Sequence, residues 1–337
     1  LSTVYAQLHP QPKMSEPKNK ITLPPIYKDT LVRHIFPSVK SVVSLRNTDT
    51  VSDCLWRLTK EQLISAPVFD EKGKIIGIVD VLDFCLFAIG MFPKEVNLEN
   101  LTEEQVEQVV SVGQKFQNSP VEDVLQLSYA LKEHQHVFYV TRDTPISRLL
   151  ELFYGGVHRV AVTSASDEES AEKGLLLNII SQSDLLGVFA QTLPLMDKEA
   201  RNKTVKDLQL GTRDLVTASH KKRAIDVLYK MNKWISKPII SAVPIVDDNG
   251  ALVGTFSASN LKGITPSSFA NLLLPVLQYL KWQPETSFLA SMQNAKSLHP
   301  VTVTEWSTFE EVVLKLAATR VHRLWIVDDD NKPIGVI

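Results

Sequence analysis

The chain has 337 residues, with 36 lysines and arginines against 38 aspartates and glutamates, so its formal net charge is −2. This balance excludes a global electrostatic attraction to nucleic acid or anionic lipid, and any anion site has to be local. The apolar runs are too short to span a bilayer, and Cys54 and Cys85 lack the spacing of a metal site or a disulfide framework. We expect two domains and a cytoplasmic protein, with the nucleus as a second location.

Residues 1–36 contain five prolines, which predict an extended segment with little packing of its own. The sequence starts without methionine and stops at Ile337 inside an expected strand. We therefore expect a fragment of a longer chain.

From about Val39 onward one pattern recurs four times: an apolar strand, an amphipathic helix, two apolar strands joined by a turn, and a second helix. The expected first strand, first helix and second strand are 39–44, 51–62 and 66–70 in copy one; 137–141, 146–153 and 157–162 in copy two; 215–217, 223–232 and 241–247 in copy three; and 301–303, 309–319 and 321–328 in copy four. Matching positions in the four copies are Pro67, Ala161, Pro244 and Trp325.

Helical segments separate the copies. Residues 101–116 and 121–131 have amphipathic patterns, and residues 269–280 are apolar almost all round. A single copy cannot bury both faces of its sheet, so copies are expected to pair. The prediction is an α/β fold of four tandem βαββα repeats in two modules. The first module covers 37–195 with a helical linker at about 97–132; the second covers 196–337 with a linker at about 266–297 and a truncated fourth repeat.

This pattern resembles the CBS-domain family, in which two repeats form a Bateman module with adenosine-nucleotide clefts between them. Within that family, four copies with His158-Arg159 and His322-Arg323 before the second strand resemble the gamma subunits of AMP-activated protein kinase. Residues 207–212, ahead of copy three, support the same resemblance.

The family's ribose-binding pattern is Ser or Thr, two residues, and then Asp at the start of the second helix. A carboxylate there can accept hydrogen bonds from both ribose hydroxyls. Copy one has Asp80 in place of the hydroxyl, which makes nearby phosphates less favourable, and copy four ends before this position. The same spacing is typical of a helix capping box, so capping stays open as an alternative. The candidate ribose-binding residues are Asp83 in copy one, Ser181 and Asp184 in copy two, and Ser257 and the weaker partner Asn260 in copy three.

The resemblance implies that His158, Arg159, His322 and Arg323 bind phosphate, because the equivalent pairs of gamma subunits point into a central channel. An arginine offers a planar fork of donors that matches phosphate oxygens. A solvated surface pair is the alternative.

The resemblance further implies nucleotide contacts at Thr212, Thr217, Ser241 and Ala242, although ordinary strand ends and turns explain these residues equally well. In copy one, Ser65 stands where gamma subunits often carry arginine, so one phosphate contact is lost.

The sequence has no phosphate-cradling glycine-rich loop, no metal-spaced cluster and no arrangement of a catalytic triad. No catalytic residue, metal or cofactor is therefore expected. The resemblance implies a non-catalytic regulatory subunit that binds AMP, ADP or ATP and controls a protein kinase, together with catalytic and scaffold subunits in a heterotrimer. Two alternatives stay open: a four-repeat regulator of a type 2A-like protein phosphatase, as in fungi, and a scaffold that has lost nucleotide binding. A homodimer is compatible with each, and no nucleic acid partner is expected.

Overall fold

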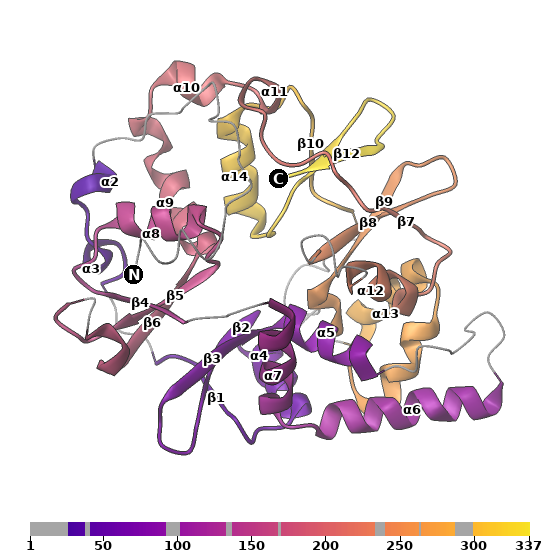
Figure 1. Cartoon of the computed structure of the whole chain (residues 1–337). Helices are drawn as coiled ribbons and strands as arrows, with labels where there is room; N and C mark the ends of the chain where they lie inside the picture. Colours follow the sequence, from indigo (N-terminus) through magenta and orange to yellow (C-terminus); the bar gives the residue numbers. More distant parts are fainter. Residues whose placement is uncertain are drawn as a thin grey trace.

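The computed structural model describes residues 26–37, 41–91, 102–132, 137–167, 170–232, 240–262, 264–286 and 299–337. Within these ranges the chain forms four three-stranded sheets, one in each copy, with helices packed beside them (Figure 1). The expected α/β fold of four repeats is confirmed.

All four sheets share one topology. The first strand lies parallel to the second, and the second pairs antiparallel with the third. A parallel pair needs a crossover, which the first helix of each copy supplies, whereas an antiparallel pair needs only a turn. In copies one and three this turn contains Gly73 and Gly250, with φ of +77° and +83°. Glycine is favoured there because a Cβ atom disfavours positive φ.

The repeated elements have similar bounds from copy to copy. Copy one contains β1 Leu45–Arg46, α4 Val51–Lys60, β2 Ser65–Phe69, β3 Ile75–Asp80 and α5 Val81–Met91. Copy two contains β4 Phe138–Thr141, α8 Ile146–Tyr154, β5 Arg159–Thr163, η1 Ala171–Lys173, β6 Leu176–Ser181 and α9 Gln182–Thr192. Copy three contains β7 Ala218–Ser219, α12 Ala224–Asn232, β8 Ala242–Val246, β9 Leu252–Ser257 and η3 Ala258–Leu261. Copy four contains β10 Thr302–Val303, α14 Phe309–Thr319, β11 Trp325–Val327 and β12 Pro333–Val336.

Further helices connect the copies. They are α2 Ile26–Asp29 and α3 Val32–Ile35 before copy one; α6 Glu103–Asn118 and α7 Val121–Lys132 before copy two; η2 Leu193–Leu195, α10 Lys198–Asn202 and α11 Val205–Leu208 before copy three; and η4 Pro266–Leu273 and α13 Val276–Thr286 before copy four.

Some element bounds differ from the sequence-based expectation. The first strands of copies one and three are only two residues long and begin later than expected. In copy three the apolar Leu215 lies outside the strand and packs against a cluster that contains Ala242, Leu252, Trp325 and Val327. The helix expected over 269–280 is divided at Pro275, because proline lacks a backbone N–H and disfavours helical backbone in the residue before it.

Copies one and two form a first pair, and copies three and four form a second pair. Within each pair, the helix that precedes one copy packs on the other copy. Thus α3 and α11 contact copies two and four, whereas α7 and α13 contact copies one and three. Each copy therefore packs against a helix that adjoins the other copy of its pair in the sequence. Matching isolated bridges mark the four contacts: Leu31 with Pro145, Thr50 with Pro120, Thr204 with Thr308, and Arg223 with Pro275.

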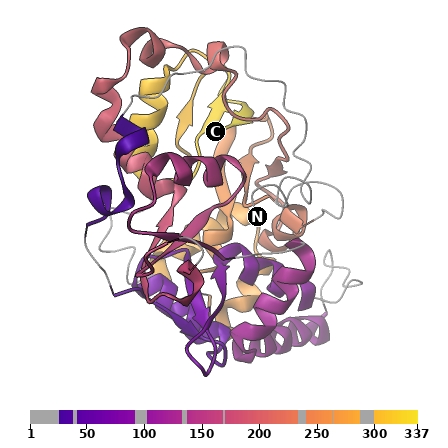
Figure 2. The same cartoon turned by 60° about the vertical axis from the view of Figure 1, so that its left-hand side comes forward.

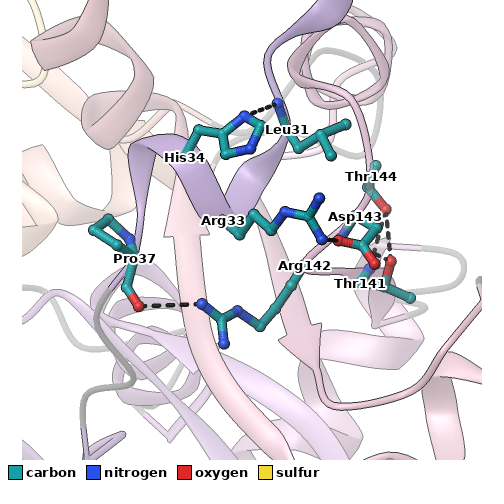
Figure 3. Close-up of polar contacts among 8 residues, drawn as sticks. All are labelled: Leu31, Arg33, His34, Pro37, Thr141, Arg142, Asp143 and Thr144. Atoms are coloured by element: carbon teal, nitrogen blue, oxygen red, sulfur yellow. Dashed lines mark hydrogen bonds and ion pairs between the residues drawn. The ribbon is translucent and has the colours of Figure 1, made fainter.

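Residues 26–37 illustrate this exchange (Figure 3). Arg33 forms an ion pair with Asp143 of copy two, and Arg142 donates a hydrogen bond to the Pro37 carbonyl at 3.2 Å. The segment expected to be extended therefore contains two short helices in its described part, because copy two supplies their packing partners.

The four copies close into a ring in the order one, two, four, three (Figures 1 and 2). Copy one contacts copy three through α5 against α12 and η3, including a contact of 3.5 Å between Cys85 Sγ and the Ala258 carbonyl. Copy two contacts copy four through α9 against α14. In the first pair Lys74 of copy one lies 3.2 Å from Glu172 of copy two, and in the second pair the N–H of Leu252 donates to the Asn331 carbonyl at 2.8 Å.

The hydrophobic core is distributed unevenly around this ring. One continuous cluster joins copies one and three with their linkers, where the rings of Phe116 and Phe269 lie 5.6 Å apart. Copies two and four have separate cores, and a small cluster around Leu193, Met196 and Val313 connects them. The ring is therefore packed more extensively on the side of copies one and three.

Candidate functional site

Two arginines at matching positions mark the second strands of copies two and four. Arg159 is the first residue of β5, and Arg323 lies two residues before β11. Both sequences place a histidine immediately before the arginine. The structure brings each arginine against the other copy of its own pair, but the chemical partner differs.

Arg323 reaches from copy four to copy three. Its Nη2 atom donates a hydrogen bond to Oγ of Ser241 at 2.9 Å. No carboxylate forms an ion pair with this guanidinium anywhere in the described ranges. Burial lowers the pKa of Arg323 to about 10, so the group still carries its charge at neutral pH. A partly buried cation whose described partner is a neutral hydroxyl is a suitable point for an anion to bind.

His322 extends this site toward copy two. Its side chain is exposed, and Nδ1 lies 3.2 Å from Oγ of Ser183 in the first turn of α9. The His322-Arg323 pair therefore contacts copies two and three while belonging to copy four. The junction of these three copies is the candidate site.

Arg159 has a charged partner. Its Nη1 atom lies 3.4 Å from Oδ2 of Asp80, at the end of β3 in copy one. The side chains are only 13% and 25% exposed, respectively. The neighbouring His158 is exposed, and its carbonyl accepts a hydrogen bond from the N–H of Gln182 at 3.3 Å.

The ribose candidates of copies two and three form capping boxes. Ser181 Oγ accepts from the N–H of Asp184, whose carboxylate accepts from the N–H of Ser181 at 2.8 Å. Asn260 plays the role of the acid for Ser257, with Oδ1 accepting from the Ser257 N–H at 2.7 Å. The capping alternative is therefore confirmed. Asp184 is exposed and remains accessible to a ligand, so its ribose role stays a prediction.

Asp83 is placed differently. Its side chain is 1% exposed, and its two carboxylate oxygens accept hydrogen bonds from Ser128 Oγ at 2.7 Å and from the Asp80 N–H at 2.8 Å. The burial of this carboxylate keeps a ribose hydroxyl from reaching it. The ribose contact predicted for Asp83 therefore requires a local rearrangement of α5 and α7.

Of the four other predicted contacts, Ser241 lies at the candidate phosphate site, where its hydroxyl accepts a hydrogen bond from Arg323. Thr212 is exposed and forms a bridge with Val336, with backbone hydrogen bonds of 2.9 Å in both directions. The carbonyl of Thr217 accepts from Nζ of Lys230 at 3.0 Å, and Ala242 is buried as the first residue of β8. Direct nucleotide contacts at these residues stay predictions.

The sequence pattern does not reveal two of these contacts. Asp80 stands out as an extra carboxylate, but nothing local identifies Arg159 as its partner. Ser183 is likewise separated from His322 by more than a whole copy. Only the pairing of the copies brings these residues together.

Other classes of site have no support in the described ranges. No three histidine, cysteine or acidic side chains gather there as metal ligands. None of the described helices combines the length and apolarity needed to cross a membrane.

Comparison with known proteins identifies the repeats. The family model for the CBS domain matches residues 32–89, 131–191, 205–264 and 295–337, one match for each copy.

Related curated proteins come from fungi. The chain is 23% identical to protein SDS23 of Scheffersomyces stipitis over 309 residues, which covers 90% of this chain and 53% of that protein. It is 31% identical to protein sds23 of Aspergillus niger over 185 residues, which covers 53% of this chain and 34% of that protein. The chain thus spans about half the length, or less, of these relatives.

A solved structure shares the arrangement of all four copies. Protein MJ1225 of Methanocaldococcus jannaschii, an archaeal protein likened to g-AMPK, superposes with a TM-score of 0.61 at 20% identity and covers 91% of this chain and 96% of its own. At this identity the likeness concerns the fold alone.

Proposed function

We propose that this chain, which belongs to the CBS-domain family, is a non-catalytic regulator that binds an adenine nucleotide and controls a type 2A-like protein phosphatase. The four repeats occupy most of the chain. Regulation is therefore a better fit to its residues than catalysis.

Arg323 is the observation that carries the ligand half of this proposal. Its charge is partly buried between copies three and four, and its described hydrogen-bond partner is the neutral Ser241 hydroxyl. A phosphate group would supply the missing negative charge through charge-assisted hydrogen bonds. The exposed His322, 3.2 Å from Ser183, would form the neighbouring wall of the site.

The partner half rests on the fungal relatives. Similarity to SDS23 proteins extends over 90% of the chain and supports a phosphatase client. The kinase interpretation, with a heterotrimeric complex, is supported by the shared four-repeat fold, which does not itself select a client. A type 2A-like phosphatase is therefore the preferred partner.

The mechanism follows from the position of the site. A ligand at Arg323 would contact copies two, three and four at once, because His322 reaches copy two and Arg323 reaches copy three. Such a ligand stabilises one arrangement of these copies over another. The nucleotide changes the free energy of binding between the chain and the phosphatase. This change equals the difference in nucleotide-binding free energy between the free chain and the phosphatase-bound chain.

The ligand is tested by calorimetric titration of the purified chain with AMP, ADP and ATP. Arg323→Ala is expected to weaken binding about 10- to 100-fold, because it removes a charge-assisted pair. Arg148→Ala, which removes an arginine of α8 that is 38% exposed, is the matched control and should bind like the unmodified chain. Equal affinity in the Arg323→Ala variant would contradict the assignment of this site.

The client is tested with purified proteins. The chain is mixed with a type 2A-like catalytic subunit, and hydrolysis of a phosphopeptide is followed with and without AMP. We expect the chain to change the rate at which the catalytic subunit hydrolyses the phosphopeptide. AMP should shift the concentration of the chain that gives half of this effect by about fivefold or more. A parallel assay with kinase catalytic and scaffold subunits decides the alternative: a nucleotide-dependent effect on the kinase alone would refute the phosphatase assignment.

Two further features are part of the proposal. The predicted module boundaries, residues 37–195 and 196–337, stay part of the proposal, because each range contains one pair of copies. Cys54 and Cys85 are free and buried, which fits a reducing compartment such as the cytoplasm or nucleus.

A further inference from the structure

We infer that Asp80 is a built-in substitute for a ligand phosphate, so that the first pair of copies is closed to anions and only the second pair accepts one. The inference rests on the proposed function, because it concerns which of two matching arginines serves the ligand. It assigns to Asp80 the role of a specificity-determining residue.

The first step is the geometry of the matching positions. In copy one Ser65 pairs across the hairpin with Asp80, and in copy three Ala242 pairs with Ser257. Asp80 and Ser257 therefore occupy the same position in their sheets. One carries a carboxylate and the other a hydroxyl.

The second step is the consequence for the arginines. Oδ2 of Asp80 lies 3.4 Å from Nη1 of Arg159, where a phosphate oxygen would otherwise bind. Ser257 instead directs its hydroxyl to Oδ1 of Asn260 at 3.3 Å and brings no charge toward Arg323. The charge of Arg159 is thus compensated within the protein, whereas that of Arg323 is left for a ligand.

The third step is the rigidity of the substitute. Oδ1 of Asp80 accepts hydrogen bonds from the N–H groups of Leu82 at 2.8 Å and Asp83 at 3.2 Å, at the start of α5. These bonds hold the carboxylate in place, with Oδ2 directed toward Arg159. An incoming anion would have to displace this preorganised carboxylate from Arg159. The affinity of the anion is reduced by the free energy of the ion pair that it breaks.

The test exchanges the two residues. Asp80→Ser gives copy one the hydroxyl of copy three and retains an oxygen that can cap α5; Asp80→Asn is the second variant, close in shape and without charge. Each is titrated calorimetrically with AMP, adenosine and inorganic phosphate. Thermal melting checks that the variants are folded.

The unmodified chain is expected to bind one AMP, and Asp80→Ser to bind two. Adding Arg159→Ala to Asp80→Ser should remove the second site. The reverse exchange, Ser257→Asp, should weaken the site at Arg323 about tenfold or more, because it places a competing carboxylate in copy three. Binding of AMP but not phosphate would identify a nucleotide site, and binding of phosphate but not adenosine would identify a site for the anion alone.

The outcomes separate this inference from the proposed function. Two sites in the unmodified chain, one of them lost with Arg159→Ala, would overturn the inference and leave the proposed function intact. No added site in either folded Asp80 variant would also overturn it. If the unmodified chain binds nothing but Asp80→Ser binds one anion through Arg159, the blocking role of Asp80 stands, whereas the site at Arg323 fails and with it both the proposed function and the claim that the second pair accepts an anion.

Discussion

In the first pair of copies Arg159 lies 3.4 Å from the Asp80 carboxylate, whereas in the second pair Arg323 donates to the Ser241 hydroxyl at 2.9 Å. The two arginines occupy matching positions in repeats of the same topology. Their difference therefore comes from a few side chains of the facing copy. Among the described residues, the guanidinium of Arg159 forms an ion pair with a carboxylate, whereas that of Arg323 forms none.

A second difference lies two residues further along the same strands. Trp325 in copy four is 2% exposed, and its Nε1 donates to Thr255 Oγ1 of copy three at 2.7 Å. The matching residue in copy two is Ala161, which is fully buried and small. The second pair thus joins its copies with a large side chain and a hydrogen bond, whereas the first pair has a small side chain at this position and an ion pair between Arg159 and Asp80.

The largest expected effect is loss of Trp325. Trp325→Ala should lower the free energy of unfolding by about 3–5 kcal/mol, because it opens a cavity between copies three and four. Trp325→Phe retains most of the volume and should cost only about 1–2 kcal/mol. Urea unfolding monitored by circular dichroism measures both. If Trp325→Ala lowered the free energy of unfolding by less than Trp325→Phe does, the Trp325 contact would not hold the second pair together.

Gly211 tests the backbone contact that is found in the second pair. A Cβ atom at this residue would lie 2.2 Å from the Val336 carbonyl oxygen, and its φ is +76°. Gly211→Ala should destabilise the protein by about 2–4 kcal/mol, from positive φ and steric overlap together. Gly73, with φ of +77° and open space around its Cβ position, is the matched control in the first pair.

We expect Gly73→Ala to cost only about 1–2 kcal/mol, because positive φ is its sole penalty. Thermal melting of both variants checks the comparison. If Gly211→Ala and Gly73→Ala destabilised the protein equally, the backbone at the bridge between Thr212 and Val336 would have adjusted to the added Cβ atom at no cost in free energy.

Removal of Asp80 should destabilise the first pair moderately. Asp80→Ala removes the cap of α5 and leaves the partly buried Arg159 without its carboxylate, at an expected cost of about 1–3 kcal/mol. Ser257→Ala, the matching change in copy three, removes a cap without breaking an ion pair and should cost about 0.5–1 kcal/mol. Denaturant midpoints compare the two, and an equal cost would argue against a structural role for the ion pair.

The smallest effect concerns pH. Two hydrogen bonds from Thr204 lower the pKa of Asp207 below its usual 3.8. The bond from the backbone N–H has the larger effect, and the bond from the side-chain hydroxyl has the smaller one. A carboxylate with a lowered pKa in the folded state contributes stability that is present above its unfolded pKa and lost as pH falls through its folded pKa. In the first pair the matching position is His34, which accepts from the Leu31 N–H, so this carboxylate cap is a feature of the second pair.

The measurement is the urea midpoint between about pH 5 and about pH 2. Asp207→Asn should flatten the acid side of the profile slightly relative to the unmodified chain. An unchanged slope would mean that Asp207 contributes nothing measurable.

Much of the fold can be predicted from local sequence patterns. The first helix of each copy appears where the apolar periodicity predicts it, as with Val51–Lys60 and Phe309–Thr319. Hairpin turns follow their glycines, as at Gly73 and Gly250. Both features depend on residues close together in the chain, and so a local pattern is sufficient to detect them.

The candidate site is predicted less completely. Recurrence of His-Arg identifies Arg159 and Arg323, but it predicts the same role for both. Their roles diverge because Asp80 and Ser241 come from the facing copies, more than 75 residues away along the chain. Likewise, the sequence predicts Asp83 as a ribose-binding residue. Only the packing of α7 shows that the carboxylate of Asp83 accepts a hydrogen bond from the Ser128 hydroxyl.

The sequence by itself determines the number of repeats, their βαββα order and the recurrence of the His-Arg pair, because periodicity and recurrence are properties of the chain. Tertiary structure alone decides that linker helices are exchanged within each pair, that copies one and three share a core, and that in the described part of the chain Arg159, but not Arg323, forms an ion pair with a carboxylate. The physical reason is that charge compensation and burial depend on which side chains meet across copies.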